Sequence, residues 1–390
     1  MRDLLNWEIL KSDNYVVLDF ETDTSGGQFG AASQPDNRLL LACWKCGPDH
    51  IRGMRLPEGR DAGVLSCWGG EYEQNDLLDD IQSADFVVAH NAKYEAGWLI
   101  RMGVPVEEQV WFCTRLAEYV LLGNRAAGGE GLAPVRISLD ACVRRRGGVM
   151  KDPVVDRLIK NGVNPVRIPR KWLQGRCMKD VADTEKLFLD QRASLTSTGR
   201  LPVLWTRSLI SPVLAEIEQT GMYVDRARVE SAHYEYTRKL VELDEELDKM
   251  TGGINTRSSK QVAEFVYGVL GFKEKTDKQG KPKRTGTGMP LTSQKVLDTL
   301  VATNKKQKQF IALRKERSKT SAALSKALDF LLGVAREKGG RFLGEFNQAH
   351  TATHRLSSSG VPITFADGIT RTTQFQNLPR AFKPLFGPGE

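Results

Sequence analysis

Hydrophobic positions follow a strand-like pattern in much of the first half of the chain. Four short runs rich in β-branched and aromatic residues are expected to be strands. Three other segments space their apolar residues at helical intervals. Strands that come first and then alternate with helices indicate an α/β layer, in which helices cover a mixed sheet. The expected strands are "NYVVLDFET", "RLLLACWKC", "HIRGMRL" and "ADFVVAHN", and the expected helices are "AKYEAGWLIRMG", "ISLDACVRRRG" and "LQGRCMKDVADTEKLFLDQRASL".

The pattern becomes mostly helical near residue 200. Pro212 is expected to open one helix and Gly221 to close it, and a long amphipathic helix follows. The Gly- and Lys-rich stretch "KEKTDKQGKPKRTGTGMPLTS" is expected to be a mobile loop before helical periodicity returns. The pattern predicts an α/β domain over residues 1–196, a mostly helical domain over residues 197–340 and a terminal piece over residues 341–390.

Composition and charge narrow the class of protein without deciding it. The chain has 390 residues, of which 40% are hydrophobic and 27% charged, as in ordinary globular proteins. A net charge of +8 favours a polyanionic partner, although a merely basic soluble enzyme fits the charge equally well. No signal peptide or run of about 20 apolar residues is present, so we expect a cytoplasmic protein.

The six cysteines do not have the spacing of a disulfide-rich domain, which favours a reduced state. Cys43 and Cys46 form a C-x-x-C pair, but no second Cys or His pair follows at zinc spacing. We favour two cysteines on a buried strand over a metal or redox site.

Carboxylates provide the first candidate chemistry. Asp19 and Glu21 stand two residues apart at the end of an expected strand, so both side chains lie on one face. Two hard oxygen ligands on one face suit Mg²⁺, although paired acids at strand ends are also common surface features. Glu95 lies in the first turn of a helix, where the helix dipole favours a carboxylate in any case.

A later helix carries two further acids. Asp180 borders the apolar face of this helix, whereas Asp183 is expected to be solvated. If Asp180 converges with the earlier carboxylates, the four could hold two divalent ions about 4 Å apart and support in-line displacement at phosphorus. No P-loop or nucleophilic Ser or Cys motif offers a competing chemistry.

The segments "VLDFET", "VVAHNAKYE" and "CMKDVADT" resemble, in order and spacing, the three motifs of the DEDD 3′–5′ exonucleases. The resemblance implies a ribonuclease H-like fold and two divalent cations, Mg²⁺ or Mn²⁺, as cofactors. His90 and Asn91 match the "HN" that precedes the second acid, and the resemblance gives them a structural or substrate-positioning role. The catalytic and metal-binding residues that it implies are Asp19, Glu21, Glu95 and Asp180.

Two positions depart from this family pattern. Glu95 stands where the family usually has Asp, which moves the carboxylate by roughly one bond length. The family has a Tyr four residues, or a His five residues, before its last acid to orient the attacking water. Before Asp180 these positions are Arg176 and Gly175. Arg stays protonated and cannot act as a base, but a metal ion also lowers the pKa of its bound water. The resemblance therefore implies a nuclease that is slow or has lost its activity, with Arg176 positioned at the substrate.

The second half resembles the family A DNA polymerases. "ISPVLAEIEQTGMYVDRARVE" is similar to the segment after their exonuclease domain, and the helices that follow are similar to their thumb. The tail, "THRLSSSG" and then "FQNLPRAFKPLF", resembles "TGRLSSS…QNIPR", which enters the palm, with His354 in place of the usual Gly. The insertion between Ser359 and Gln374 resembles a phage-type branch. The likeness covers nearly the whole chain with its motifs in order.

This second resemblance implies contacts with primer–template DNA. A series of basic residues along one helical segment is expected to meet duplex phosphates, with a solvated charged face as the alternative. Arg355, Gln376 and Asn377 are donors suited to minor-groove acceptors. The Lys-rich loop is either a contact at the tip of the thumb or a disordered loop. The basic residues are Lys305, Lys306, Lys308, Arg314, Lys315, Arg317 and Lys319.

The resemblance also implies a partner, because neither palm aspartate of the polymerase site is in this chain. We expect a metal-dependent 3′–5′ exonuclease and primer–template-binding subunit of a split or truncated polymerase, unable to polymerise alone. A C-terminal half with the palm core and fingers would complete it as a heterodimer. The alternatives are a catalytically decayed nuclease that serves as a DNA-binding assembly subunit, and a free-standing nuclease, which leaves the thumb unexplained. Tail residues expected to be exposed for the missing palm are Phe375, Leu378, Phe382, Leu385 and Phe386.

Overall fold

The backbone forms two compact units, each of which is described by itself. The first contains Met1–Gly221 and Leu343–Val361, and the second contains Met222–Phe342 and Pro362–Glu390. The expected strand at residues 50–56 falls outside the part of the chain that is described. The computed structural model describes residues 6–25, 30–49, 62–66, 74–128, 133–256, 258–276, 282–286 and 288–387.

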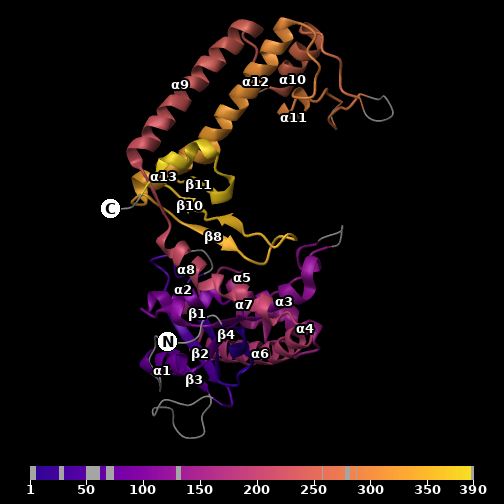
Figure 1. Ribbon diagram of the computed structural model, residues 1–390. Helices are drawn as coiled ribbons and strands as arrows, with labels where there is room; N and C mark the ends of the chain where they lie inside the picture. Colours follow the sequence, from indigo (N-terminus) through magenta and orange to yellow (C-terminus); the bar gives the residue numbers. More distant parts are fainter. Residues whose placement is uncertain are drawn as a thin grey trace. The chain divides into compact units, whose positions relative to one another are not determined.

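A five-stranded mixed sheet forms the centre of the first unit (Figure 1). A mixed sheet was predicted, but its strands Ala62–Ser66 and Trp111–Cys113 were not. Its strand order is β3-β2-β1-β4-β5. β1 is antiparallel to β2 and parallel to β4, so β1 lies where the sheet changes direction. The strands are β1 (Tyr15–Thr22), β2 (Leu39–Cys46), β3 (Ala62–Ser66), β4 (Phe86–Ala89) and β5 (Trp111–Cys113).

One long helix, α6, packs against β1 and β2. The ring of Phe188 on α6 lies edge-on against three rings of the sheet, with centroid distances of 4.9 Å to Tyr15, 5.8 Å to Phe86 and 4.8 Å to Phe112. These contacts fix α6 over the strand that carries Asp19. The other elements of this unit are η1 (Trp7–Lys11), α1 (Gln74–Ser83), α2 (Lys93–Arg101), η3 (Val106–Glu108), α3 (Thr114–Leu122), η4 (Gly123–Ala127), α4 (Leu139–Arg145), α5 (Pro153–Lys160), η6 (Pro165–Arg167), α6 (Arg170–Ser197), α7 (Leu201–Ser208), α8 (Ile210–Thr220) and the hairpin strands β8 (Gly344–Asn347) and β9 (Ser357–Gly360).

The first unit extends past the expected boundary at residue 196. Leu201, Leu204 and Ala215, from α7 and α8, are buried in the same core as the sheet. α8 begins at Ile210, two residues before Pro212, and ends at Thr220. The next residue, Gly221, has a φ of 67°, which favours glycine. The two helices that follow the sheet domain therefore belong to its core.

Two long helices, α9 and α12, lie side by side in the second unit (Figure 1). α9 begins after Asp225, whose carboxylate accepts a hydrogen bond from the backbone N–H of Arg228 and caps the helix. At the other end, Gly252 closes α9 with a φ of 73°. The elements are β6 (Met222–Val224), α9 (Arg226–Thr251), α10 (Ser259–Ala263), η7 (Glu264–Val269), α11 (Gln294–Leu297), α12 (Lys305–Ala323), η8 (Leu324–Leu328), α13 (Asp329–Glu337), β7 (Arg341–Phe342), β10 (Ile363–Thr364), β11 (Thr370–Arg371), η9 (Phe375–Asn377), η10 (Arg380–Leu385) and β12 (Phe386–Gly387).

The tail is packed, and the expectation that its apolar residues are exposed is wrong. Phe382 and Leu385 are only 2% and 6% exposed. Phe375, Leu378 and Phe386 are partly buried against the same core of the second unit. β12 also pairs with β6, which satisfies a strand edge. These residues complete the core of this chain, so they do not form an apolar surface that calls for a partner.

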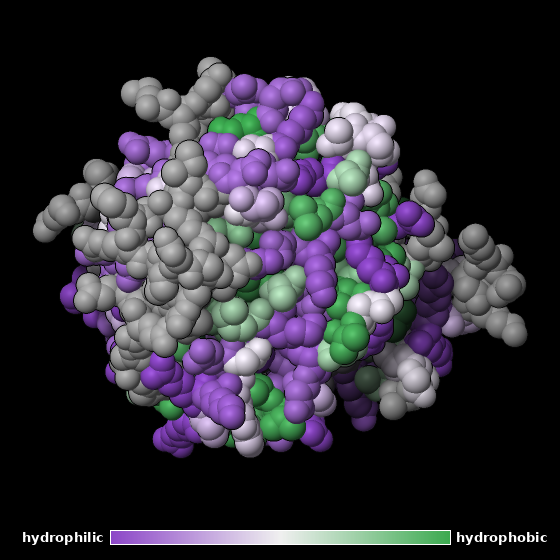
Figure 2. Space-filling view, turned by 90° about the horizontal axis from the view of Figure 1, so that it is seen from below, coloured by the Kyte–Doolittle hydropathy of each residue, from purple (hydrophilic) through white to green (hydrophobic). Residues whose placement is uncertain are grey.

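Two surface features complete the description of the fold. Among the described residues, no helix is long and apolar enough to cross a membrane. On the face seen in Figure 2, hydrophobic side chains lie in small groups between hydrophilic ones.

Cys43 and Cys46 are buried on β2 as free thiols, which agrees with the strand interpretation.

Candidate functional site

β1 carries the first two acids of the candidate site. Asp19 and Glu21 alternate with the buried Leu18 and Phe20, so their side chains share one face of the strand. The thiol of Cys177, on α6, donates a hydrogen bond to the backbone carbonyl of Asp19 at 3.3 Å. The carboxylates of Asp19 and Glu21 and the Cys177 sulfur lie within 4.8 Å of one another. The packing of α6 on β1 therefore brings Cys177 next to Asp19 and Glu21.

Glu95 and Asp180 come from two helices, and both are buried. Glu95 is the third residue of α2 and is 3% exposed, and its Oε2 has no hydrogen-bond partner among the described residues. Asp180 lies in the middle of α6 and is 5% exposed. A buried carboxylate oxygen without a partner is costly, and a bound cation is one way to satisfy it.

Burial and mutual repulsion perturb all four carboxylates. Desolvation raises the pKa of Asp19 well above its usual value, and the negative charges of Asp180 and Glu21 add to the effect. Desolvation likewise raises the pKa of Glu95, with Asp19 as the nearby charge. The pKa of Glu21 rises to about 7 and that of Asp180 also rises, chiefly through burial. Negative charges at Asp180 and Glu21 therefore act on Asp19, and the charge of Asp19 acts on Glu95.

Arg176 is an internal cation in this acid cluster. It lies one helical turn before Asp180 on α6, and its Nη1 forms an ion pair with Glu21. The same nitrogen lies 3.9 Å from Asp180, and Nε donates to Asp156 at 3.1 Å. The guanidinium is therefore held between the strand acid, the helix acid and α5.

Lys151 is a second internal cation, which the sequence pattern did not single out. It lies between α4 and α5, and its Nζ donates to both oxygens of Asp180, at 3.0 and 2.9 Å. A longer contact of 3.6 Å joins it to Asp140, whose side chain is 42% exposed. The lysine belongs to no motif and reaches Asp180 across 29 residues of sequence, so no local pattern indicated the contact.

The residues of the "HN" pair are held by neighbouring side chains. Asn91 has a φ of 79°, which is uncommon for a residue other than glycine, and its Oδ1 accepts a hydrogen bond from Arg115 at 3.1 Å. The Nδ1 atom of His90 lies 2.9 Å from the hydroxyl of Thr114. Desolvation lowers the pKa of His90 to about 3, so its ring is neutral near pH 7. His90 and Asn91 therefore fix the turn from β4 into α2, which carries Glu95.

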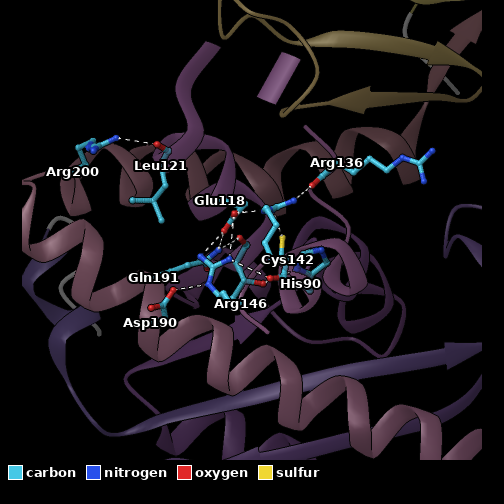
Figure 3. Close-up of polar contacts among 11 residues, drawn as sticks. His90, Glu118, Leu121, Arg136, Cys142, Arg146, Asp190, Gln191 and Arg200 are labelled. Atoms are coloured by element: carbon cyan, nitrogen blue, oxygen red, sulfur yellow. Dashed lines mark hydrogen bonds and ion pairs between the residues drawn. The ribbon is translucent and has the colours of Figure 1, made fainter. Parts of the chain in front are cut away.

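A buried ionic network centred on Glu118 joins three helices near His90 (Figure 3). The Glu118 carboxylate accepts hydrogen bonds from Arg145 at 2.8 Å, from Arg146 at 2.9 Å and from Gln191 at 2.7 Å. Burial opposes the ionisation of Glu118, but these donors outweigh it and lower the pKa of the carboxyl. Since Glu118 lies on α3, the arginines at the end of α4 and Gln191 on α6, the network ties α3 and α4 to the helix of Asp180.

Asp183 is buried, so the prediction that it is solvated is wrong. It is 8% exposed and pairs with Lys179, one turn earlier on α6. Lys179 also donates to the backbone carbonyl of Val149 at 3.0 Å. Lys179 therefore links Asp183 to the segment before α5, a contact that the helical period alone did not reveal.

The basic residues on α12 divide into an exposed set and a packed set. Lys308, Lys315 and Lys319 are exposed and, at about 100° per residue, lie within about 40° of one another around the helix. Lys305 borders this face, whereas Lys306 is exposed on another side. We call Lys305, Lys308, Lys315 and Lys319 the lysine face.

Arg317 does not belong to the exposed set, and its predicted place in the phosphate-binding series is wrong. It is 8% exposed and donates to Asp244 of α9, with Nη2 to Oδ2 at 3.2 Å. Arg314 is partly buried, and its Nε has no partner among the described residues. Arg317 therefore joins α12 to α9.

A cavity of about 910 Å³ in the second unit brings two predicted DNA-binding residues together. Lys319 and Asn377 line it, together with Lys239, Lys326 and Arg371. Lys239 is paired with Glu316, and Arg371 with Asp367 at 2.6 Å. Four of the lining residues are therefore cations, and two of these four are already ion-paired.

The predicted minor-groove donors are exposed but lie in different units. Arg355 is exposed in the first unit, between β8 and β9. Gln376 and Asn377 are exposed on η9 of the second unit, where Asn377 donates to Gln374 at 2.6 Å. Their joint action on DNA remains a prediction.

Comparison with known proteins identifies the relatives of the chain. Residues 226–384 match DNA polymerase family A. The chain is 26% identical to DNA polymerase I of Rhizobium leguminosarum over 385 residues, which cover 93% of this chain and 36% of that protein. It is 31% identical to DNA polymerase I of Pseudomonas aeruginosa over 182 residues, which cover 45% of this chain and 18% of that protein. The chain thus spans about a third or less of the length of these relatives.

A solved structure has a similar fold. It is described as the POL domain of Pol1 from M. smegmatis in complex with DNA primer-template and dNTP. The TM-score is 0.62 at 17% identity, and the alignment covers 98% of this chain and 58% of that one. At this identity the likeness shows the fold alone.

Proposed function

We propose that this chain is the 3′–5′ exonuclease and primer–template-binding part of a family A DNA polymerase. Its residues 226–384 match that family. The observation that carries the exonuclease proposal is the pair Asp19 and Glu21 on one face of β1, with Arg176 between Glu21 and Asp180 of α6. The buried Glu95 is electrostatically coupled to Asp19. The mixed sheet supports a ribonuclease H-like classification of the first unit.

The donor set fits hard divalent cations. All four side chains offer carboxylate oxygens, and the Glu95 Oε2 is buried without a partner among the described residues. Bound Mg²⁺ or Mn²⁺ would neutralise phosphate charge and supply a water of lowered pKa. Asp19, Glu21, Glu95 and Asp180 would hold the metal, and the neutral His90 with Asn91 would keep the helix of Glu95 in place. Arg176 is suited to orient a phosphate, because it is a fixed, always charged donor.

A second candidate function rests on the same cations. Arg176 is paired with Glu21, and Lys151 with Asp180, so two of the four acids already have counterions. This pairing favours a decayed nuclease in which the first unit only assembles and binds DNA. The two candidates differ in whether the chain cleaves DNA.

The lysine face supports the DNA-binding proposal. Charges that lie along one side of an exposed helix suit the regular phosphates of a duplex. The cation-rich cavity, with Lys319 and Asn377 in its wall, adjoins this helix in the same unit. Like the POL domain of the solved structure, this part of the chain would bind primer–template.

We further propose that nucleotide addition needs palm and finger segments supplied by further polypeptide, either a separate C-terminal half or a continuation of this chain. The packed tail removes one reason to expect an exposed interface. The remaining support is that the chain aligns with only 36% of the length of the Rhizobium leguminosarum polymerase. A phage source and a place in the host cytoplasm belong to the same proposal.

The deciding experiment uses single-stranded DNA labelled at its 3′ end, with Mg²⁺ or Mn²⁺. The parent chain should release labelled nucleotide, and Asp19→Ala and Asp180→Ala should abolish release, because each removes a metal ligand. Asp183→Ala is the matched control, since it removes a buried acid of α6 outside the cluster. A parent that binds DNA but never cleaves it supports the second candidate. Full activity in both Asp19→Ala and Asp180→Ala rules out the assignment.

A further inference from the structure

A tryptophan lies exposed at the start of the helix that carries Asp180. Trp172 is the third residue of α6 and is 51% exposed. No hydrogen bond or ring contact joins it to another residue that the structure describes. Tryptophan is highly buried on average, as Trp44, Trp98 and Trp111 of this unit are. The indole ring of Trp172 is therefore accessible to a ligand.

This ring lies on the side of α6 that carries the helix residues of the candidate site. Arg176 follows Trp172 by four residues and Asp180 follows it by eight, so at about 100° per residue the three lie within about 80° around the helix. The rise of about 1.5 Å per residue places Trp172 about 6 Å from Arg176 and about 12 Å from Asp180 along the axis. Trp172 is therefore one turn beyond Arg176, in the direction away from Asp180.

The segment that leads into α6 packs together with the start of this helix. Val155 of α5 and Ile168, which precedes α6, are buried in one small core with Leu173, the residue next to Trp172. α5 has only eight residues, so it is about 12 Å long. The charges of α5 and of the connection to α6 therefore lie near the exposed ring.

This segment is basic, and its positive charges are not compensated locally. Residues 152–172 contain five cations against two acids. Both acids have partners, since Asp152 caps α5 and Asp156 pairs with Arg176. None of the five cations forms an ion pair with a residue that the structure describes, and all except the partly buried Arg170 are exposed. The cations are Arg157, Lys160, Arg167, Arg170 and Lys171.

An exposed indole ring among unpaired cations suits a single strand of nucleic acid. The bases of a single strand can stack on an aromatic side chain, whereas the bases of a duplex are stacked on one another. Cations beside the ring attract the phosphates of the same strand. A protein partner fits this surface less well, because lysine is depleted in the cores of protein interfaces.

We infer that Trp172 is a base-stacking platform that, with Arg170 and Lys171, binds single-stranded DNA next to the candidate site. The inference rests on the proposed function for the site to which the strand leads, but binding is measured without metal and without cleavage. A base on the indole ring leaves a neighbouring phosphate one helical turn away, at Arg176. Trp172 is in this arrangement a substrate-binding residue that lies outside the acids.

The experiment measures binding of the full chain to oligo(dT) of about 12 nucleotides, a length within the span of single-strand-binding grooves. The oligonucleotide carries fluorescein at its 5′ end, and its anisotropy is followed in EDTA. Trp172→Ala should weaken binding at least about fivefold, the effect of one lost base–aromatic stack. Trp172→Phe keeps a ring and should retain most of the affinity. Leu189→Ala, which shortens a 41% exposed apolar side chain of the same helix, should bind as the parent does.

Two further measurements separate stacking from charge. Trp172→Ala should leave the salt slope of binding unchanged, because stacking on the ring releases no counterions. Arg170→Gln/Lys171→Gln should reduce the slope by about 0.7 per lost phosphate contact. Stacking should also quench the fluorescence of Trp172, so oligo(dT) should quench the parent more than it quenches Trp172→Phe.

The affinities decide the inference independently of the proposed function. An unchanged affinity for oligo(dT) in Trp172→Ala overturns it and leaves the ring to a protein contact, and an equal loss of affinity for a duplex of the same length also overturns it. If Trp172→Ala does not fold, the quenching difference between the parent and Trp172→Phe decides. Binding that depends on Trp172 without any cleavage contradicts the proposed nuclease and leaves the inference standing, whereas cleavage with binding independent of Trp172 does the reverse.

Discussion

Replacement of Glu118 by Gln should destabilise the first unit by about 2–3 kcal/mol. The carboxylate is 3% exposed and accepts hydrogen bonds from Arg145, Arg146 and Gln191. A hydrogen bond to a charged group contributes about 1.5–3 kcal/mol, and breaking a buried ion pair costs about 3–5 kcal/mol. The side chains of Arg145 and Arg146 are 31% and 29% exposed, so water partly replaces the lost contacts. Because of this partial solvation, the expected loss of unfolding free energy is about 2–3 kcal/mol, below the cost of breaking a fully buried ion pair.

The stability of the first unit can be followed by tryptophan fluorescence during urea unfolding. All seven tryptophans of the chain lie before residue 222, so the signal reports on this unit. The matched control is Asp190→Asn, which removes a partner of Arg146 that is 55% exposed and should cost less than about 1 kcal/mol. A loss for Glu118→Gln no larger than that of the control would show that the network does not hold the helices together.

The pH dependence provides a second check on Glu118. Because the pKa of this carboxyl is lowered in the folded state, its stabilising effect is present above the usual Glu pKa of about 4.3. The effect is lost as the pH falls through the lowered folded value. The difference between the parent and Glu118→Gln should therefore be constant from about pH 6 to 8 and shrink in acid. A difference that stays constant into acid would mean that Glu118 is not ionised in the fold.

Three further outcomes are expected. Arg176→Tyr should raise the rate of single-strand cleavage without changing its metal dependence, if the orientation of water limits the rate; an unchanged or lower rate would mean that Arg176 is part of the working site. Charge reversal of Lys308, Lys315 and Lys319 should weaken primer–template binding and reduce its salt slope by about one unit per lost phosphate contact, and Lys306→Glu should do less; equal slopes would place the lysine face in solvent. The purified chain should not extend a primer with nucleotides, and extension by this chain alone would contradict the need for further palm and finger segments.

The sequence pattern was sufficient for β1, β2 and β4 and for the position of the acids on β1, but it did not single out β3 or β5. The strict alternation in β1 placed Asp19 and Glu21 on one face, because side chains of a strand point to opposite sides in turn. The turn after β4 placed Glu95 at the start of a helix. The prediction that these acids meet Asp180 rested on a family resemblance, because no local sequence pattern shows which elements pack together.

Contacts between distant segments account for what the sequence did not reveal. Lys151 reaches Asp180 from a loop, and Arg317 turns from a predicted DNA contact into a partner of Asp244 on α9. Asp183 is buried beside Lys179, which also donates to the backbone carbonyl of Val149 before α5. In the tail, Phe382 is buried in the second unit's own core. In each case the residue type was evident, but its partner depended on the tertiary fold.

One measurement tests most directly whether the two units act on the same DNA. A primer labelled at its 5′ end and annealed to a template, with a mismatched 3′ terminus, is incubated with the chain and Mg²⁺ in the absence of nucleotides. The account predicts stepwise shortening of the primer and no shortening with Asp19→Ala. It also predicts slower shortening at low protein concentration when Lys308, Lys315 and Lys319 are reversed in charge. An intact primer at saturating protein, or shortening that Asp19→Ala leaves unchanged, would contradict it.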